Sequence, residues 1–129
     1  MSTQTKQQEA YQKEAENRWG HTEAYKQSVE RASKWTDEDK QRIETEGTAI
    51  RTATAELMGK PIADTAVQVQ MERYYQYMQT FYNCSYEMFA GLGDLYTQDP
   101  RFTAYYDDIK PGLAKFMCDA MHYYADKHK

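Results

Sequence analysis

Apolar side chains recur at helical spacing along most of this chain, and no stretch alternates in the way of a half-buried strand. The clearest stretch covers residues 113–124, where the apolar positions fall on a single helix face: Leu113, Phe116, Met117, Ala120, Met121 and Tyr124. No internal repeat interrupts this pattern. The chain is therefore predicted to be an all-α domain of six or seven helices.

Capping residues and helix breakers predict where these helices begin and end. Helix starts are expected at residues that can cap free backbone N–H groups, or at a proline in the first turn: Thr22, Thr36, Asp64 or Thr65, Ser85, Asp99-Pro100 and Pro111. Helix ends are expected near Gly20, Ser33, Gly59, Asn83, Asp99 and Asp108. Residues 126–129 are expected to form a solvated tail.

Three of the predicted helices carry narrower apolar stripes. The stripes read Tyr25, Val29 and Ala32; Ile43, Ile50 and Leu57, with Gly47 and Thr54 between them; and Met88, Leu92, Leu95 and Tyr96. The second stripe repeats every seven residues, but over only about two heptads, which favours a packed surface helix over a coiled coil. Another helix, over residues 65–83, should bury Val67, Met71, Tyr74, Met78 and Phe81.

The first twenty residues form a separate, more polar segment. Residues 5–19 are helix-prone, yet only Tyr11, Ala15 and Trp19 could supply an apolar stripe. A helix with so little surface to bury is marginal by itself. We therefore expect residues 1–20 to be a mobile helical segment and residues 21–129 to form the helical domain.

The apolar composition changes the expected nature of the core. Four Leu, four Ile and three Val stand against twelve Tyr, four Phe, two Trp and seven Met. A buried Tyr hydroxyl needs a partner or water, and Met adapts to irregular shapes. Two interpretations stay open: a partly wet, adaptable cavity, or an ordinary helical core built from unusual residues.

Charge and apolar patterning exclude several classes of function. The net charge is −4 with a pI near 5.4, and no basic stripe is present, so direct nucleic-acid binding by this chain is not expected. No apolar run is long enough to span a membrane, and the polar start does not resemble a signal peptide. A cytoplasmic protein with reduced cysteines is expected.

Residues able to do chemistry are sparse. No nucleophile–base arrangement, phosphate-binding glycine loop or apolar carboxylate pair is recognisable, so an enzyme is not expected and no cofactor is implied. Cys118 and His122 are spaced i, i+4 and could face one ion, with Cys84 joining from elsewhere. This is only half of a metal motif, and no metal site is predicted.

Two blocks of the sequence resemble a known family. Residues 83–121 read NCSYEMFAGLGDLYTQDPRFTAYYDDIKPGLAKFMCDAM, and residues 18–28 read RWGHTEAYKQS, which is similar to a W-G-x-T-x-A-Y-x-x-S signature. Together they resemble the TipAS-type antibiotic-recognition domain, the effector-binding half of drug-sensing regulators of the MerR class. The likeness covers residues 8–125 and implies a globin-like arrangement of helices with a ligand cleft.

Gly91 and Gly93 lie inside a predicted helix, where each costs about 1 kcal/mol relative to Ala. Close packing of another helix or a ligand wall would explain them. In the best-known branch of the family, a cysteine seven residues beyond the position of Cys84 reacts with dehydroamino acids of thiopeptides. Gly91 takes that place here, so the chain departs from the family at the usual reactive position, and reversible binding is the remaining hypothesis.

The resemblance implies binding of a hydrophobic multi-ring antibiotic, such as a thiopeptide-like macrocycle. The expected ligand-binding residues are Trp19, Tyr25, Met71, Tyr74, Tyr75, Met78, Phe81, Tyr82, Cys84, Met88, Gly91, Leu95, Phe102, Tyr105 and Tyr106. In the family this domain follows a DNA-binding domain, so the chain is expected to be either the sensing part of such an activator or a free-standing drug-sequestering protein. A small helical protein-interaction module without a ligand is the alternative.

Overall fold

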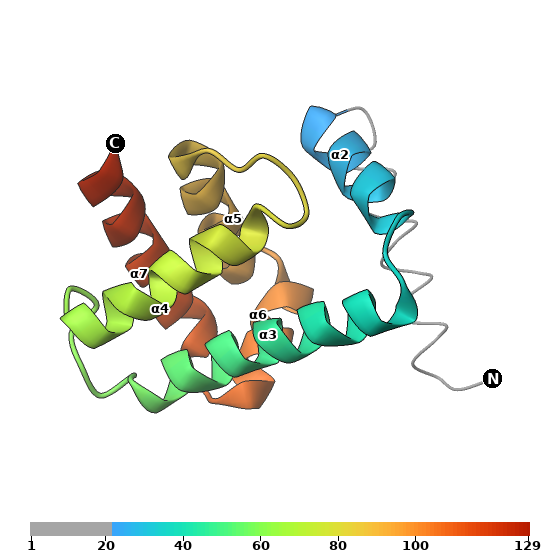
Figure 1. Ribbon diagram of the computed structural model, residues 1–129. Coiled ribbons are helices and arrows are strands. Elements are labelled where there is room, and N and C mark those ends of the chain that lie inside the picture. The colour runs from blue at the N-terminus through green and yellow to red at the C-terminus, as the bar shows by residue number, and fades with distance from the viewer. Residues whose placement is uncertain (1–21) are drawn as a thin grey trace.

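A computed structural model describes residues 22–129 of the chain. Within this range it contains six helices and no strand, as the apolar pattern predicts: α2 (Glu23–Ala32), α3 (Asp37–Glu56), α4 (Thr65–Met78), α5 (Tyr86–Gln98), α6 (Pro100–Ile109) and α7 (Leu113–His128). Helices α3 to α7 pack around one another, while α2 stands to one side (Figure 1). The expected helix over residues 5–19, with Trp19, lies outside the described residues.

The predicted caps fix the start of five helices. A side-chain oxygen of each capping residue accepts a hydrogen bond from a backbone N–H in the first turn: Thr22 from Tyr25, Thr36 from Asp39, Asp64 from Ala66, Ser85 from Met88 and Asp99 from Arg101. The Asp39 carboxylate in turn accepts a hydrogen bond from the backbone N–H of Thr36, which completes a capping box.

Three predicted boundaries are wrong. Helix α4 ends at Met78, five residues before Asn83, and a turn follows it. Helix α7 begins at Leu113 rather than Pro111, because Gly112 has a φ of 91°, a left-handed conformation that cannot continue a helix backwards. The same helix runs to His128, so most of the expected tail is helical, although its residues are exposed.

The core lies among α3 to α7. Eight residues of α7 are buried, which confirms the apolar face read from residues 113–124 apart from Phe116, which is only half-buried. Tyr74 sits at the centre, where its hydroxyl lies 2.6 Å from that of Tyr96 and 2.9 Å from that of Tyr106. These three buried hydroxyls satisfy one another. This part of the core therefore needs no water to satisfy its polar groups.

Helix α5 packs most extensively against α7, and Gly93 permits their approach. A Cβ atom added to Gly93 would lie 3.2 Å from the Cα of Cys118, closer than side chains normally come to a neighbouring backbone. Helices α3 and α4 meet in a similar way, since a Cβ on Gly47 would lie 2.5 Å from the Tyr77 hydroxyl. The apolar stripe predicted for α3 is confirmed at its centre, where Ile50 and Thr54 are fully buried.

Two predicted faces are wrong. Val29 is 50% exposed, and α2 buries none of its residues. In α5 the buried face consists of Phe89, Gly93 and Tyr96, so Met88 lies on the outside and is 39% exposed. The stripe from Met88 to Leu95 is therefore a partly exposed flank of α5.

No helix in residues 22–129 is both long enough and apolar enough to cross a bilayer.

Candidate functional site

The turn between α4 and α5 organises the candidate site. The Gln79 side chain accepts a hydrogen bond from the Cys84 backbone N–H at 3.0 Å and donates one to the Cys84 carbonyl at 2.9 Å. The Tyr75 hydroxyl donates to the same carbonyl at 2.7 Å. These bonds replace the helical bonds that α4 would otherwise continue to make, which explains why it ends at Met78. The turn is held closed by the side chains of Tyr75 in α4 and of Gln79, the C-cap residue of that helix.

Helix α2 is attached to this turn mainly through polar groups. The Arg31 guanidinium donates to the Gln79 carbonyl and to the Asn83 side-chain oxygen, each at 2.7 Å. The Asn83 backbone N–H donates to the Gln27 side chain at 2.8 Å. Just beyond the helix, the Trp35 ring contacts Phe81 edge-on, with centroids 5.7 Å apart. Helix α2 is thus bonded to the turn while contributing no buried residue to the core.

The outer flank of α5 begins directly after the turn. Met88, Gly91 and Leu95 lie at i, i+3 and i+7, which places them on one side of the helix. A Cβ added to Gly91 would meet no atom within 4 Å, so Gly91 faces open space. The two glycines therefore have different roles: Gly93 is needed for helix packing, and Gly91 leaves room on the outside.

Neither cysteine has the properties of a reactive nucleophile. Cys84 is 4% exposed, and burial raises the pKa of its thiol to about 11. Burial also raises the pKa of Cys118, and the nearby Asp94 carboxylate acts in the same direction. The thiolate is the reactive form of cysteine, so both groups are largely inert at neutral pH.

Several predicted ligand-binding residues lie in the core instead of on an accessible surface. Met71, Tyr74, Met78 and Tyr106 are all at most 8% exposed, and Cys84 is buried beside them. A ligand cannot reach these side chains without displacing the packing around them. In the described conformation they are part of the packed core.

The other predicted residues divide between two partly exposed regions. Tyr75, Phe81 and Tyr82 are half-buried around the α4–α5 turn, and Tyr25 is half-buried on α2. Burial raises the pKa of Tyr82 well above its usual value, so it stays a neutral phenol.

The second region is on α6. Phe102 packs beside Tyr96 with ring centroids 6.1 Å apart, whereas Tyr105 is 52% exposed. The Arg51 guanidinium lies over the Tyr105 ring, 5.4 Å from its centroid. Tyr105 therefore presents its other side to solvent.

Sequence reasoning missed the polar residues that build the turn. Nothing in the composition distinguished Gln27, Arg31 or Gln79 from ordinary solvated side chains. Tyr86 was also missed, although its ring stacks on Tyr75 with centroids 4.8 Å apart. Tyr86 directly follows the predicted cap Ser85, which placed it in the first turn of α5. Its position in the sequence could not show that its ring would contact α4.

An open hollow of about 670 Å³ lies elsewhere, along one face of α3. Within residues 22–129 its lining contains none of the predicted ligand-binding residues and consists of Gln41, Glu44, Thr45, Thr48, Ala49, Thr52, Ala53 and Glu56. The lining residues in the described part of the chain all come from α3, whereas a typical ligand site is enclosed by several elements.

The packed α3–α7 helices, with a further helix held against the α4–α5 turn, define a globin-like helical domain. The family model of the TipAS antibiotic-recognition domain matches residues 11–124. The chain belongs to this family.

Named relatives of the chain are transcriptional regulators. The transcriptional activator TipA of Streptomyces coelicolor is 39% identical over 121 residues, which make up 92% of this chain and 48% of the relative. The regulator SkgA of Caulobacter vibrioides is 34% identical over 95 residues, or 70% of this chain and 37% of the relative. The chain thus spans about half the length, or less, of the curated relatives it matches.

A solved structure is also closely similar. It is TipAS in complex with nosiheptide, described as part of a thiopeptide antibiotic multidrug resistance system from Streptomyces lividans. The likeness has a TM-score of 0.86 at 38% sequence identity and covers 94% of this chain and 87% of the other. At this identity and coverage, the arrangement of helices in the two proteins is shared.

Proposed function

We propose that this chain binds a hydrophobic multi-ring antibiotic of the thiopeptide kind and acts by binding, without catalysis. The observation that carries the proposal is the likeness, at 38% identity and TM-score 0.86, to a TipAS structure that contains nosiheptide. Relatives named as transcriptional activators support a role as the sensing part of a cytoplasmic MerR-class regulator. A free-standing protein that sequesters the drug is the other form that the same binding could take.

The flank of α5 is the part of the structure that best suits such a ligand. Met88 supplies an exposed, adaptable thioether, Leu95 adds apolar surface, and Gly91 leaves the space between them open. The half-buried rings of Phe81 and Tyr82 lie on the turn that leads into this helix. Flat heterocycles stack well on aromatic and thioether surfaces of this kind.

The proposed binding is reversible. A thiol at position 91 would face open space, but Gly91 has none, and both cysteines of the chain are buried with raised pKa values. A dehydroamino acid in the ligand would therefore find no thiolate to attack it. Intact-mass measurement after incubation with nosiheptide should give the masses of the free protein and of the unchanged antibiotic.

Helix α2 would complete the site. It is bonded to the α4–α5 turn through Arg31 and Gln27, has no fully buried residue, and carries the half-buried Tyr25. A ligand that touched both α2 and the flank of α5 would add the apolar contact that this attachment lacks. Order gained in this way is what a longer regulator could pass to a DNA-binding partner.

The binding proposal is tested by titrating intrinsic tryptophan fluorescence with nosiheptide. The Trp35 ring contacts Phe81, so a ligand near the turn should change its emission. The wild type should respond saturably, and Gly91→Leu should raise Kd by about tenfold or more, or about 1.4 kcal/mol, because its side chain fills the open space. The response of helical circular dichroism should follow the same curve.

Gly59→Leu is the matched control, because Gly59 also faces open space but lies in the α3–α4 connection. This variant should bind like the wild type. If both leucine variants bind nosiheptide with the wild-type Kd, the ligand does not use the flank of α5. If the wild type gives no saturable response to nosiheptide or to other thiopeptides, the binding function itself is wrong.

A further inference from the structure

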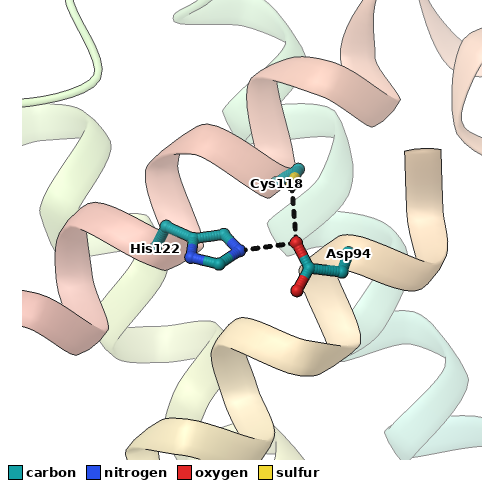
Figure 2. A group of neighbouring side chains, drawn as sticks. All are labelled: Asp94, Cys118 and His122. Carbon is teal, nitrogen blue, oxygen red and sulfur yellow. Dashed lines mark hydrogen bonds and ion pairs between the residues drawn. The ribbon is translucent and has the colours of Figure 1, made fainter. Parts of the chain in front are cut away.

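Three side chains with metal-binding atoms meet on the seam between α5 and α7. Asp94 comes from α5, and Cys118 and His122 lie one turn apart on α7 (Figure 2). The Nε2 atom of His122 is 2.7 Å from Oδ1 of Asp94, and the Cys118 sulfur is 3.8 Å from the same oxygen. One donor atom from each residue lies within 4.8 Å of the other two.

We propose that Asp94, Cys118 and His122 form a binding site for a zinc-class divalent cation that joins α5 to α7. The sequence offered Cys118 and His122 as half of a motif, with Cys84 as a possible third donor. The fold supplies Asp94 instead, because the approach of α5 to α7 at Gly93 brings the next residue beside the two donors on α7.

The donor set fits a borderline metal ion such as zinc, cobalt or nickel. These ions accept thiolate sulfur, imidazole nitrogen and carboxylate oxygen together, whereas magnesium and calcium select oxygen donors. In a tetrahedral zinc site, bond lengths near 2.0–2.3 Å place the donor atoms about 3.3–3.8 Å apart. The present separations bracket this range, so small side-chain rotations would open a place for the ion.

The surroundings allow such rotations. The side chains of Asp94 and His122 are 45% and 42% exposed, so both can move and the ion can enter from solvent. Cys118 is 8% exposed and is fixed by the packing of its helix. On binding, the Cys118 thiol would release its proton to solvent and bind as a thiolate, His122 would bind through Nε2 and Asp94 through Oδ1. A water molecule would fill the fourth position.

Cobalt(II) tests the site, because a cobalt–thiolate bond gives a charge-transfer band in the near ultraviolet. The full chain should show this band with a one-to-one endpoint, and zinc should displace it. Zinc should also raise the melting temperature, since it binds the folded seam, whereas magnesium should not.

Matched variants assign the donors. Cys118→Ala should abolish the cobalt band and Cys84→Ala should keep it, since Cys84 is a buried thiol on another part of the chain. His122→Gln and Asp94→Asn, both at partly exposed positions, should each raise the zinc Kd by about tenfold or more. Removing a residue that only hydrogen-bonds to a metal ligand already costs about tenfold in affinity, and a direct ligand should cost at least as much. His128→Gln should have no such effect, because that ring stacks on Tyr124 at the end of α7.

The absence of a cobalt band in the folded wild type would overturn the proposal. So would a band that persists in Cys118→Ala, or one that is lost equally in Cys84→Ala. If Cys118→Ala does not fold, His122→Gln decides, because its thiol packing is intact: an unchanged zinc Kd in that variant rejects the site. The measurement needs no antibiotic, so it is independent of the proposed drug binding.

Discussion

Gly91 and Gly93 occupy the same helix two residues apart, yet they are expected to respond oppositely to the same substitution. A Cβ at position 91 meets no atom within 4 Å, while one at position 93 lies 3.2 Å from the Cα of Cys118. In both places alanine favours the helix by about 1 kcal/mol over glycine. Only at position 93 does a close helix oppose this gain.

Gly91→Ala should therefore raise the free energy of unfolding by up to about 1 kcal/mol. Gly93→Ala should lower it by about 1 kcal/mol. The added methyl group forces backbone atoms of α7 to move, and this strain should cost more than the helix preference of alanine offsets. Urea unfolding followed by circular dichroism measures both changes. The interpretation fails if the two variants shift stability in the same direction by the same amount.

These two glycines also show which features of single residues could be predicted from the sequence. The glycines were recognisable as unusual, and the two explanations for them, packing or an open wall, were both available. Which explanation belonged to which glycine depended on where α7 lies around α5. The same missing information put Met88 on the buried face in place of Phe89. Neither assignment can be made without the neighbouring helix.

At the scale of the element, the five capped helix starts were predictable, whereas the end of α4 was not. A start is determined by a local capping bond, as with Ser85 and Met88. The end of α4 is determined by the Gln79 side chain, which bonds to Cys84 five residues later. Glutamine is a common helix residue, so its role in closing a turn leaves no mark in the sequence.

Helix α2 gives a prediction at this scale, since its attachment depends on few bonds. Arg31→Ala removes both hydrogen bonds that its guanidinium makes to the turn. We expect amide hydrogens of α2 to exchange faster, because local opening becomes easier. Global stability should fall by less than about 1 kcal/mol, because α2 contributes no buried residue.

Lys34→Ala is the control for this change. Lys34 also carries a positive charge near the end of α2, but its exposed pairing with Glu30 stays within the same segment. Such a pair contributes little to stability, so exchange in α2 should stay close to wild type. Equal exchange in the Arg31 and Lys34 variants would show that the guanidinium does not hold α2 to the turn.

For the whole molecule, the aromatic composition predicted a tyrosine-rich interior. Of the two interpretations, an ordinary helical core matches the described residues better than a partly wet cavity does. Tyr74, Tyr96 and Tyr106 share their hydrogen bonds and leave no buried side-chain polar atom without a partner among residues 22–129. The helical class followed from periodicity. The globin-like arrangement came from the resemblance alone, because spacing along one helix does not determine which helices meet.

This core predicts a loss of stability at alkaline pH. Burial raises the pKa of Cys84 from 9.0 to about 11, and it also raises the pKa values of Tyr96 and Tyr106. A raised pKa means that the folded state favours the protonated form. The resulting stabilisation is complete below the pKa of the unfolded chain and is lost as pH rises through the folded pKa.

These groups should therefore leave the free energy of unfolding unchanged near neutral pH and should lower it between about pH 9 and pH 11, with Cys84 contributing on the order of 2 kcal/mol. Urea titrations at several pH values in this range would measure the slope. Cys84→Ala should be less stable at neutral pH, because its cavity costs packing, but its slope should be shallower. An equal slope in the variant would mean that the Cys84 thiol does not ionise in the way its burial requires, and that the decline belongs to the tyrosines.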